Sequence, residues 1–227
     1  MGQPEASSIA NYCNKVSLKT STSGGFVNIN TMTDPKHALD EQFCLARIFA
    51  IAKSEELVLQ VQGVTTAQME AQCQRLVPAF SQQISAVSIS SFDDVVRATG
   101  QQIVKSGAQP KQMAFSGSIC LGIGYRTDNT ELALASALIL TSLGQQPYSE
   151  LMGHQLANGF GTTQRYDLAT QWYDNAVEAV KLGQPAVFAQ GQAGRMDLIA
   201  AASKGMAAAG ASGADAPSSA FALPSFD

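Results

Sequence analysis

The stretch that decides the fold runs from Leu143 to Gln192 and reads LGQQPYSELMGHQLANGFGTTQRYDLATQWYDNAVEAVKLGQPAVFAQGQ. In its second half, six apolar residues recur at the spacing of one helix face: Ala169, Trp172, Tyr173, Ala176, Val177 and Val180. In its first half, a shorter apolar series precedes a Gly-Phe-Gly turn, and comprises Tyr148, Leu151, Met152 and Leu156. Because this period is typical of a helix that buries one face, the stretch predicts two helices joined by a glycine turn.

A degenerate copy of the same pattern lies upstream. Gly124 precedes Gly161 by 37 residues, and the tripeptide Glu131–Ala133 precedes Asp167–Ala169 by 36 residues. A single helix pair cannot bury its own apolar face, so a repeated pair predicts that successive pairs stack on one another.

The two copies resemble the Sel1-like repeat, a relative of the tetratricopeptide repeat, over about residues 113–192. The positions that carry the resemblance are Gly153, Gly159, Gly161, Ala169, Trp172, Tyr173 and Ala176. The resemblance implies an all-α fold of antiparallel helix pairs, stacked as a short solenoid. It also implies a role in holding other proteins together.

In a solenoid of this kind, exposed residues on the first helix of each pair line a concave binding surface. In this sequence those residues would be Glu150, His154, Gln155 and Asn158. The alternative is that these four are ordinary surface residues without a ligand.

The rest of the chain divides into four regions by pattern. We predict an irregular N-terminal segment over residues 1–34 and an N-terminal helical region over residues 35–108. The repeats, with an alanine-rich capping helix from about 186, would occupy residues 109–206. Residues 207–227 are rich in Gly, Ala, Ser and Pro, which is typical of a disordered tail. Its Phe221, Leu223 and Phe226 suggest either a frayed end or a short docking motif.

Helix starts are clear in the N-terminal helical region. Asp34-Pro35 places a capping carboxylate before a proline at the first helical position, and predicts a helix to about Val58. Along it, we expect Ile48 and Phe49 to share the apolar face and Glu41 to point away. Thr65 to Gln68 has the spacing of a capping box, Pro78 predicts a break near Val77, and Ser91 caps a third helix that ends at Gly107.

No arrangement of residues in the sequence predicts catalysis, a cofactor or a metal site. There is no Gly-x-Ser-x-Gly elbow and no phosphate-binding glycine loop. No acid or cysteine follows His154 by three or four residues, so this histidine is predicted to be structural, and His37 to be solvated. The acid pairs Glu55-Glu56 and Asp93-Asp94, together with Asp167 and Asp174, are expected to be surface charges.

Four cysteines, Cys13, Cys44, Cys73 and Cys120, are widely spaced and include no Cys-x-x-Cys pair. They are compatible with two disulfides in an oxidising compartment, in any of three pairings, or with four buried thiols. Because no signal peptide is visible in the first thirty residues, an exported, periplasmic chain that lacks its leader and a cytoplasmic chain both stay open.

The charge and apolar composition limit the classes of partner that the chain is expected to bind. The net charge of -4, without any cluster of Lys and Arg, argues against a nucleic-acid partner. No apolar run reaches the roughly 20 residues of a membrane span. We therefore expect a non-enzymatic protein–protein interaction or scaffold module of a bacterial cell envelope. The alternatives are an enzyme or enzyme inhibitor acting on a cell-wall polymer, and a structural subunit of a larger assembly.

Overall fold

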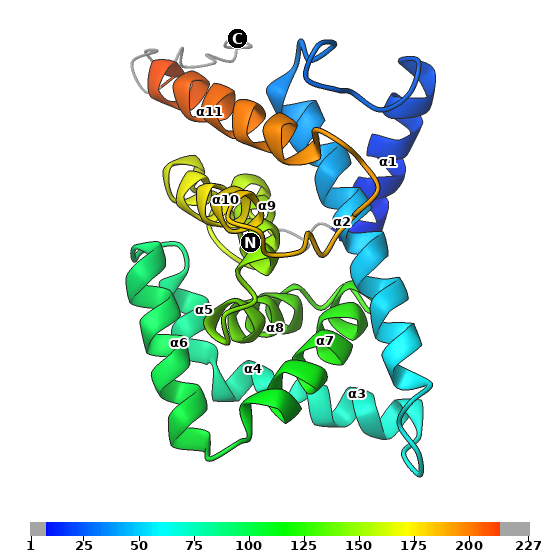
Figure 1. Cartoon of the computed structure of the whole chain (residues 1–227), viewed down its shortest axis with the longest axis vertical. Helices are drawn as coiled ribbons and strands as arrows, with labels where there is room; N and C mark the ends of the chain where they lie inside the picture. The colour runs from blue at the N-terminus through cyan, green and yellow to red at the C-terminus, as the bar shows by residue number, and fades with distance from the viewer. Residues whose placement is uncertain (1–7, 214–227) are drawn as a thin grey trace, which may run out of the picture.

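The computed structural model describes residues 8–213, which form helices joined by turns and loops, without a β-strand in that range (Figure 1). The all-α prediction is confirmed. The helices are α1 (Ile9–Thr22), α2 (Pro35–Val58), α3 (Thr66–Gln74), α4 (Leu76–Ala79), α5 (Ser81–Ala86), α6 (Phe92–Ser106), α7 (Pro110–Arg126), α8 (Thr130–Ser142), the 3-10 helix η1 (Gln146–Tyr148), α9 (Ser149–Asn158), α10 (Tyr166–Lys181) and α11 (Arg195–Gly213).

The predicted helix starts are confirmed by their caps. The side chain of Asp34 accepts a hydrogen bond from the backbone N–H of His37 at 3.1 Å, directly before Pro35. Thr65 and Gln68 form the expected capping box, and Ser91 caps α6, which ends at the left-handed Gly107. These side chains satisfy backbone donors that the first helical turn leaves unpaired, which is why the sequence marks the starts so well.

The predicted break at Pro78 occurs slightly earlier. Helix α3 ends at Gln74, and a separate short helix, α4, begins at Leu76. Pro78 is then the third residue of α4, where the N–H that proline lacks would have no helical partner.

Three expectations about the ends of the chain need correction. Residues 9–22 are helical, although the segment 1–34 was expected to be irregular; the buried side of α1 holds only three apolar residues and Thr20, too few to show a stripe. The last helix begins at Arg195, not near residue 186. It continues to Gly213, since its alanine-rich sequence has high helix propensity. The rest of the predicted disordered tail, residues 214–227, lies outside the described residues.

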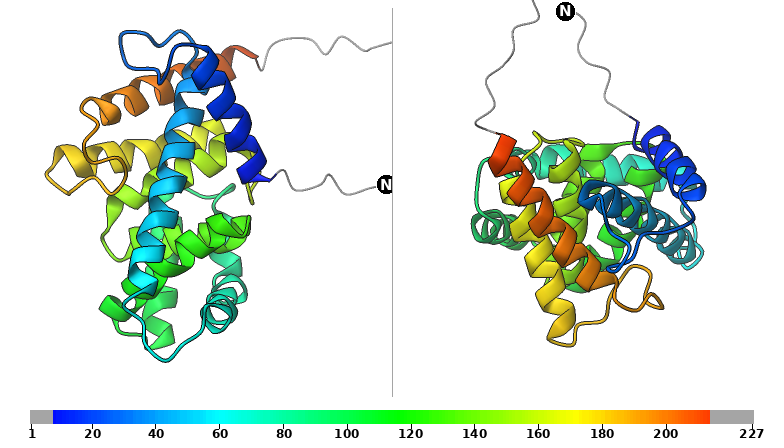
Figure 2. Two further views of the ribbon diagram at one scale, coloured as in Figure 1. Left: turned by 90° about the vertical axis from the view of Figure 1, so that its right-hand side faces the viewer. Right: turned by 90° about the horizontal axis from the view of Figure 1, so that it is seen from above.

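Helices α7 and α8 form one hairpin, and α9 and α10 form a second, with α11 packed against α10. The long helix α2 runs beside them and packs against α7, α9 and α11, the first helix of each pair and the final helix (Figures 1 and 2). The face that an open solenoid would leave concave is therefore covered by α2. One apolar cluster contains residues from α1, α2 and α5 to α11, and a second, smaller cluster joins α3 to α7 and α8, so the predicted N-terminal and repeat regions pack as one body.

This packing also corrects the predicted orientation of α2. Glu41, expected to point away, is 1% exposed, because α1 and the loop after it cover that side of the helix. Ile48 and Phe49, expected in the core, are exposed by 59% and 40%.

The aromatic face of α10 is buried as the stripe predicts. Trp172 is fully buried, and Phe92 of α6 contacts it edge-to-face, with ring centroids 4.8 Å apart. Gly153 lets α9 approach α10 closely, since a Cβ at this position would lie 2.8 Å from the ring of Tyr173. Gly159 and Gly161 have φ values of 72° and 67°, the left-handed turn conformation that glycine adopts without strain.

The four cysteines form two disulfides, Cys13–Cys44 and Cys73–Cys120. The first joins α1 to α2 and the second joins α3 to α7. They close loops of 31 and 47 residues, so each stabilises the fold by about 4 kcal/mol in the chain-entropy account. This pairing hints at an oxidising, exported environment. Within residues 8–213, no helix has the length and apolarity that crossing a membrane requires.

Candidate functional site

The four residues predicted to line a concave surface all lie on α9, but most of them are not at the surface. Glu150, His154 and Gln155 are fully buried, and Asn158 is partly buried. The expectation that they are exposed is therefore wrong for three of the four, because α2, α8 and α10 pack on α9 and Arg195 of α11 reaches Glu150.

Instead, Glu150 and His154 belong to a buried polar network that joins four helices. The guanidinium of Arg195, from α11, donates to both carboxylate oxygens of Glu150, with Nη1 2.8 Å from Oε2. His154 Nε2 lies 3.3 Å from Glu150 Oε1, and His154 Nδ1 lies 2.8 Å from the hydroxyl of Tyr173 on α10. Arg195 also donates to the backbone carbonyl of Gln42 on α2 at 3.3 Å. We refer to Arg195, Glu150, His154 and Tyr173 as the buried relay.

Proton positions in the relay follow from its chemistry. An ionised Glu150 can only accept hydrogen bonds, so the Nε2 atom of His154 must carry the proton that it shares with the carboxylate. In a neutral imidazole the Nδ1 atom then accepts, and the hydroxyl of Tyr173 donates to it. Each hydrogen bond of the relay therefore has one donor and one acceptor when His154 is neutral.

Burial and charge set the protonation states. Burial raises the pKa of Glu150, but Arg195 and His154 outweigh it and hold this pKa at about 2. Burial also lowers the pKa of His154, although Glu150 opposes that shift. Desolvation holds the pKa of Tyr173 well above its ordinary value. At neutral pH the relay is thus an ionised acid, a neutral imidazole and an intact phenol.

Carboxylate, imidazole and hydroxyl in this order resemble a catalytic relay, but the surroundings oppose that use. The four side chains of the relay are at most 4% exposed, and the hydroxyl that would act as nucleophile is held protonated. The relay therefore orients helices. The sequence does contain a spacing that indicates the pairing of Glu150 with His154. The acid precedes the histidine by four residues, whereas an acid was expected only after it.

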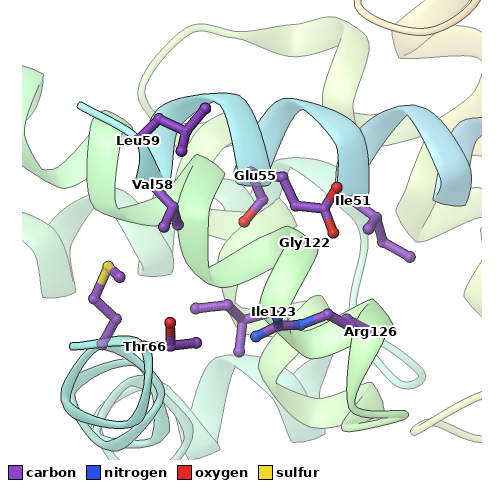
Figure 3. Close-up of a pocket in the computed structure, with 10 residues that line it drawn as sticks. Ile51, Glu55, Val58, Leu59, Thr66, Gly122, Ile123 and Arg126 are labelled. Atoms are coloured by element: carbon purple, nitrogen blue, oxygen red, sulfur yellow. The ribbon is translucent and has the colours of Figure 1, made fainter. Parts of the chain in front are cut away.

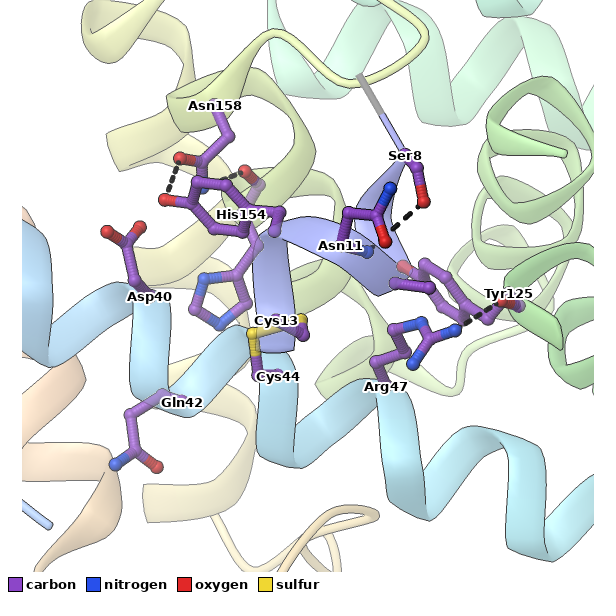
Figure 4. The surroundings of a disulfide bond; sticks show 12 residues. Ser8, Asn11, Cys13, Asp40, Gln42, Cys44, Arg47, Tyr125, His154 and Asn158 are labelled. Carbon is purple, nitrogen blue, oxygen red and sulfur yellow. Dashed lines mark hydrogen bonds between the residues drawn. A yellow bond between two sulfur atoms is a disulfide. The ribbon is translucent and has the colours of Figure 1, made fainter. Parts of the chain in front are cut away.

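A second polar cluster lies beside Asp40, closer to the surface (Figure 4). The Lys36 ammonium donates to Asp40 Oδ2 at 2.8 Å, to the Tyr12 hydroxyl at 2.8 Å and to Asn158 Oδ1 at 3.1 Å. The Tyr12 hydroxyl in turn donates to Asn158 at 2.9 Å, and burial raises the pKa of Tyr12. This cluster joins α1, α2 and α9 next to the Cys13–Cys44 disulfide.

His37, expected to be solvated, is 6% exposed. Its Nε2 lies 3.2 Å from Glu41 Oε1, and Glu41 also accepts from the hydroxyl of Thr20 at 2.6 Å and from the N–H of Val27 at 2.8 Å. Glu41 thereby fixes the end of α1 and the following loop onto α2.

Two of the carboxylates expected at the surface, Asp93 and Asp174, line one cleft of about 630 Å³ between α6, α10 and α11. Asp93 of α6 lines it together with Asp174 and Glu178 of α10, and Lys181 and Lys204 line it as well. Among the described residues, no group of three or more His, Cys, Asp and Glu side chains is placed to hold a metal ion.

Two neighbouring hollows flank the contact between α3 and α7. The smaller, about 230 Å³, lies between α2 and α7 and is lined mainly by apolar side chains such as Ile51, Val58 and Ile123 (Figure 3). The only guanidinium lining it belongs to Arg126, whose Nη2 is paired with Glu70 Oε1 at 2.6 Å.

The larger hollow, about 450 Å³, is a groove between α3 and α7, which we call the α3–α7 groove. Most of its lining is apolar, and comprises Val61, Val64, Met69, Cys73, Leu76, Ala108, Met113, Phe115, Ile119 and Cys120, with Gln72, Gln112 and Ser116 as the polar members. Phe115 is 37% exposed at this groove. No pattern in the sequence predicts the groove, because it forms only where α3 crosses α7.

No protein-family model, curated protein or solved structure matches this chain.

Proposed function

We propose that this protein is a non-enzymatic protein-binding module, a scaffold, and that it binds a partner through the α3–α7 groove. The observation that carries the proposal is the groove itself, a concave surface lined mainly by apolar side chains, at which Phe115 is exposed. A concave apolar surface with a few polar groups is the usual form of a site for an apolar side chain or a short segment of a partner.

The buried relay supports the same proposal by contrast. The acid–base groups of the relay are buried, whereas Phe115 of the groove is accessible. The two disulfides favour an exported location such as a bacterial periplasm, and the resemblance of the helix pairs to Sel1-like repeats favours a scaffold role.

Site-specific photo-crosslinking tests the proposal in the cells that produce this protein. A photoreactive amino acid replaces Phe115 in one variant and Leu18 in a control; Leu18 is 67% exposed on α1, at the other end of the molecule (Figure 1). We expect a discrete crosslinked species from position 115 alone. Equal products from both positions, or none from position 115, would refute binding at the groove.

The second candidate function is an enzyme, or an enzyme inhibitor, acting on a cell-wall polymer. One observation favours it, since carboxylates from two helices, Asp93 and Asp174, line the same cleft, and glycoside hydrolysis commonly uses two carboxylates. The test is clearing of a cell-wall suspension by the wild type and by the double variant Asp93→Asn, Asp174→Asn, with Asp197→Asn as the surface control. No clearing by the wild type, or clearing that the double variant retains, would remove the enzyme candidate.

A further inference from the structure

The unpaired charges next to lining residues of the α3–α7 groove are basic. Arg75 directly precedes the lining residue Leu76, Lys111 precedes the lining residue Gln112, and Lys105 lies three residues before the lining residue Ala108. All three are exposed, and within the described part of the chain none forms an ion pair.

Two long stretches of the chain that contribute to the groove contain no carboxylate. No Asp or Glu occurs in residues 71–92 or 95–127, which include the end of α3, α4, most of α6 and all of α7. The acid of α3, Glu70, is already paired with Arg126. In a chain with a net charge of -4, the groove thus has an apolar floor and a basic rim, and it complements an occupant that is apolar and acidic.

The chain itself contains one segment of that description. Residues 214–227 read ADAPSSAFALPSFD, with the acids Asp215 and Asp227 and the large apolar side chains Phe221, Leu223 and Phe226. No Lys or Arg follows Lys204. In an extended segment, residues two apart project to the same side, so Phe221 and Leu223 could enter one groove together. Its two prolines would reduce the conformational entropy lost on binding.

We propose that the α3–α7 groove binds residues 214–227 of a second copy of this chain. The arrangement is intermolecular because α11, which leads to this segment, and α3 lie at opposite ends of the long axis (Figure 1). Such a contact joins unlike surfaces of the two copies, head to tail, and leaves one groove and one segment open at the ends of each assembly. This inference rests on the proposed function, because it names the partner of the same groove.

The test is sedimentation velocity of the full chain over a concentration series, at low and at high salt. The wild type should self-associate, and salt should weaken the association because the rim contacts are exposed ion pairs. The rim variant Lys105→Glu, Lys111→Glu and the segment variant Phe221→Ser, Phe226→Ser should each associate at least tenfold more weakly. The control variant Lys15→Glu, Lys204→Glu makes the same charge change away from the groove and should behave like the wild type.

A mixture of the two defective variants is the decisive measurement. The segment variant keeps an intact groove and the rim variant keeps an intact segment, so together they should form a one-to-one dimer that cannot grow. A wild type that stays monomeric at every concentration would overturn the inference, as would a mixture that does not form the dimer.

Photo-crosslinking at position 115 distinguishes a failure of the self-association from a failure of the proposed binding function of the groove. A crosslink to a different protein that persists in the segment variant would overturn the self-association and leave the groove as a binding site. The absence of any crosslink would overturn both.

Discussion

The substitution Arg195→Met should lower the free energy of unfolding by a large fraction of its value, because it leaves Glu150 as an unpaired charge in the interior. The magnitude follows from the carboxylate. Its pKa is held at about 2 in the folded protein against an ordinary value of 4.5. This difference means that the folded environment as a whole favours the charged form of Glu150 by about 3 kcal/mol. Breaking a buried ion pair from one side typically costs about 3–5 kcal/mol, in agreement with that value.

The pKa of Glu150 also predicts how the free energy of unfolding changes with pH. Because the folded pKa of Glu150 is depressed, the carboxylate contributes stability above pH 4.5 that is lost as the pH falls from about 4.5 toward about 2. Without Arg195, the burial that raises this pKa has less to oppose it. The variant should therefore lose less stability than the wild type on acidification over that range.

Urea unfolding followed by tryptophan fluorescence is the assay, since Trp172 is the single tryptophan and is fully buried. Arg97→Met is the matched control: Arg97 pairs with Asp94 at the surface, where an ion pair contributes only about 0–1 kcal/mol. The double variant Glu150→Gln, Arg195→Met should be more stable than Arg195→Met alone, because it removes the unpaired charge. If Arg195→Met changes the free energy of unfolding no more than Arg97→Met does, the relay does not hold these helices together.

Three further predictions concern the same helices. Trp172→Ala removes a fully buried aromatic side chain and should lower the free energy of unfolding by roughly 3–5 kcal/mol; a thermal midpoint that barely moves would show that the stack of α6, α9 and α10 is wrong. Gly153→Ala brings a Cβ to 2.8 Å from a neighbouring ring and should destabilise by about 1–3 kcal/mol. By contrast, Gly100→Ala, which meets nothing within 4 Å in α6, should be stabilising by about 0.5–1 kcal/mol; similar effects at the two glycines would contradict the close approach. Because burial depresses the pKa of His154, stability should fall as the pH drops below about 6.5, and NMR titration of the imidazole at a pKa of 6.5 or higher would refute this.

Local rules accounted for the parts of the fold that depend on neighbouring residues. The caps at Asp34, Thr65 and Ser91 and the aromatic stripe of α10 were visible in the sequence, since each rests on spacings within one or two helical turns. Helix α1 was missed because its buried side is short and includes a threonine.

The candidate site could not be read in the same way, because burial depends on which distant segment covers a helix. Glu150 and His154 have the composition of a solvated helix face, and only the packing of α2, α8 and α10 on α9 makes them interior. The spacing of four between them was a local signal of pairing. Arg195, which neutralises Glu150, lies 45 residues away, and no local pattern connects the two.

Buried polar contacts of α2 hold this helix in one register, although most of its neighbours in the core are apolar. Lys36, paired with Asp40, donates to Tyr12 of α1 and to Asn158 of α9. Glu41 binds the end of α1 and the loop after it, and the carbonyl of Gln42 accepts from Arg195. Leaving a buried polar group without its partner costs about 1–3 kcal/mol. Sliding α2 by one residue would separate these groups from their partners on α1, the following loop, α9 and α11. The polar contacts therefore determine the register of α2, whereas apolar burial supplies most of the stability.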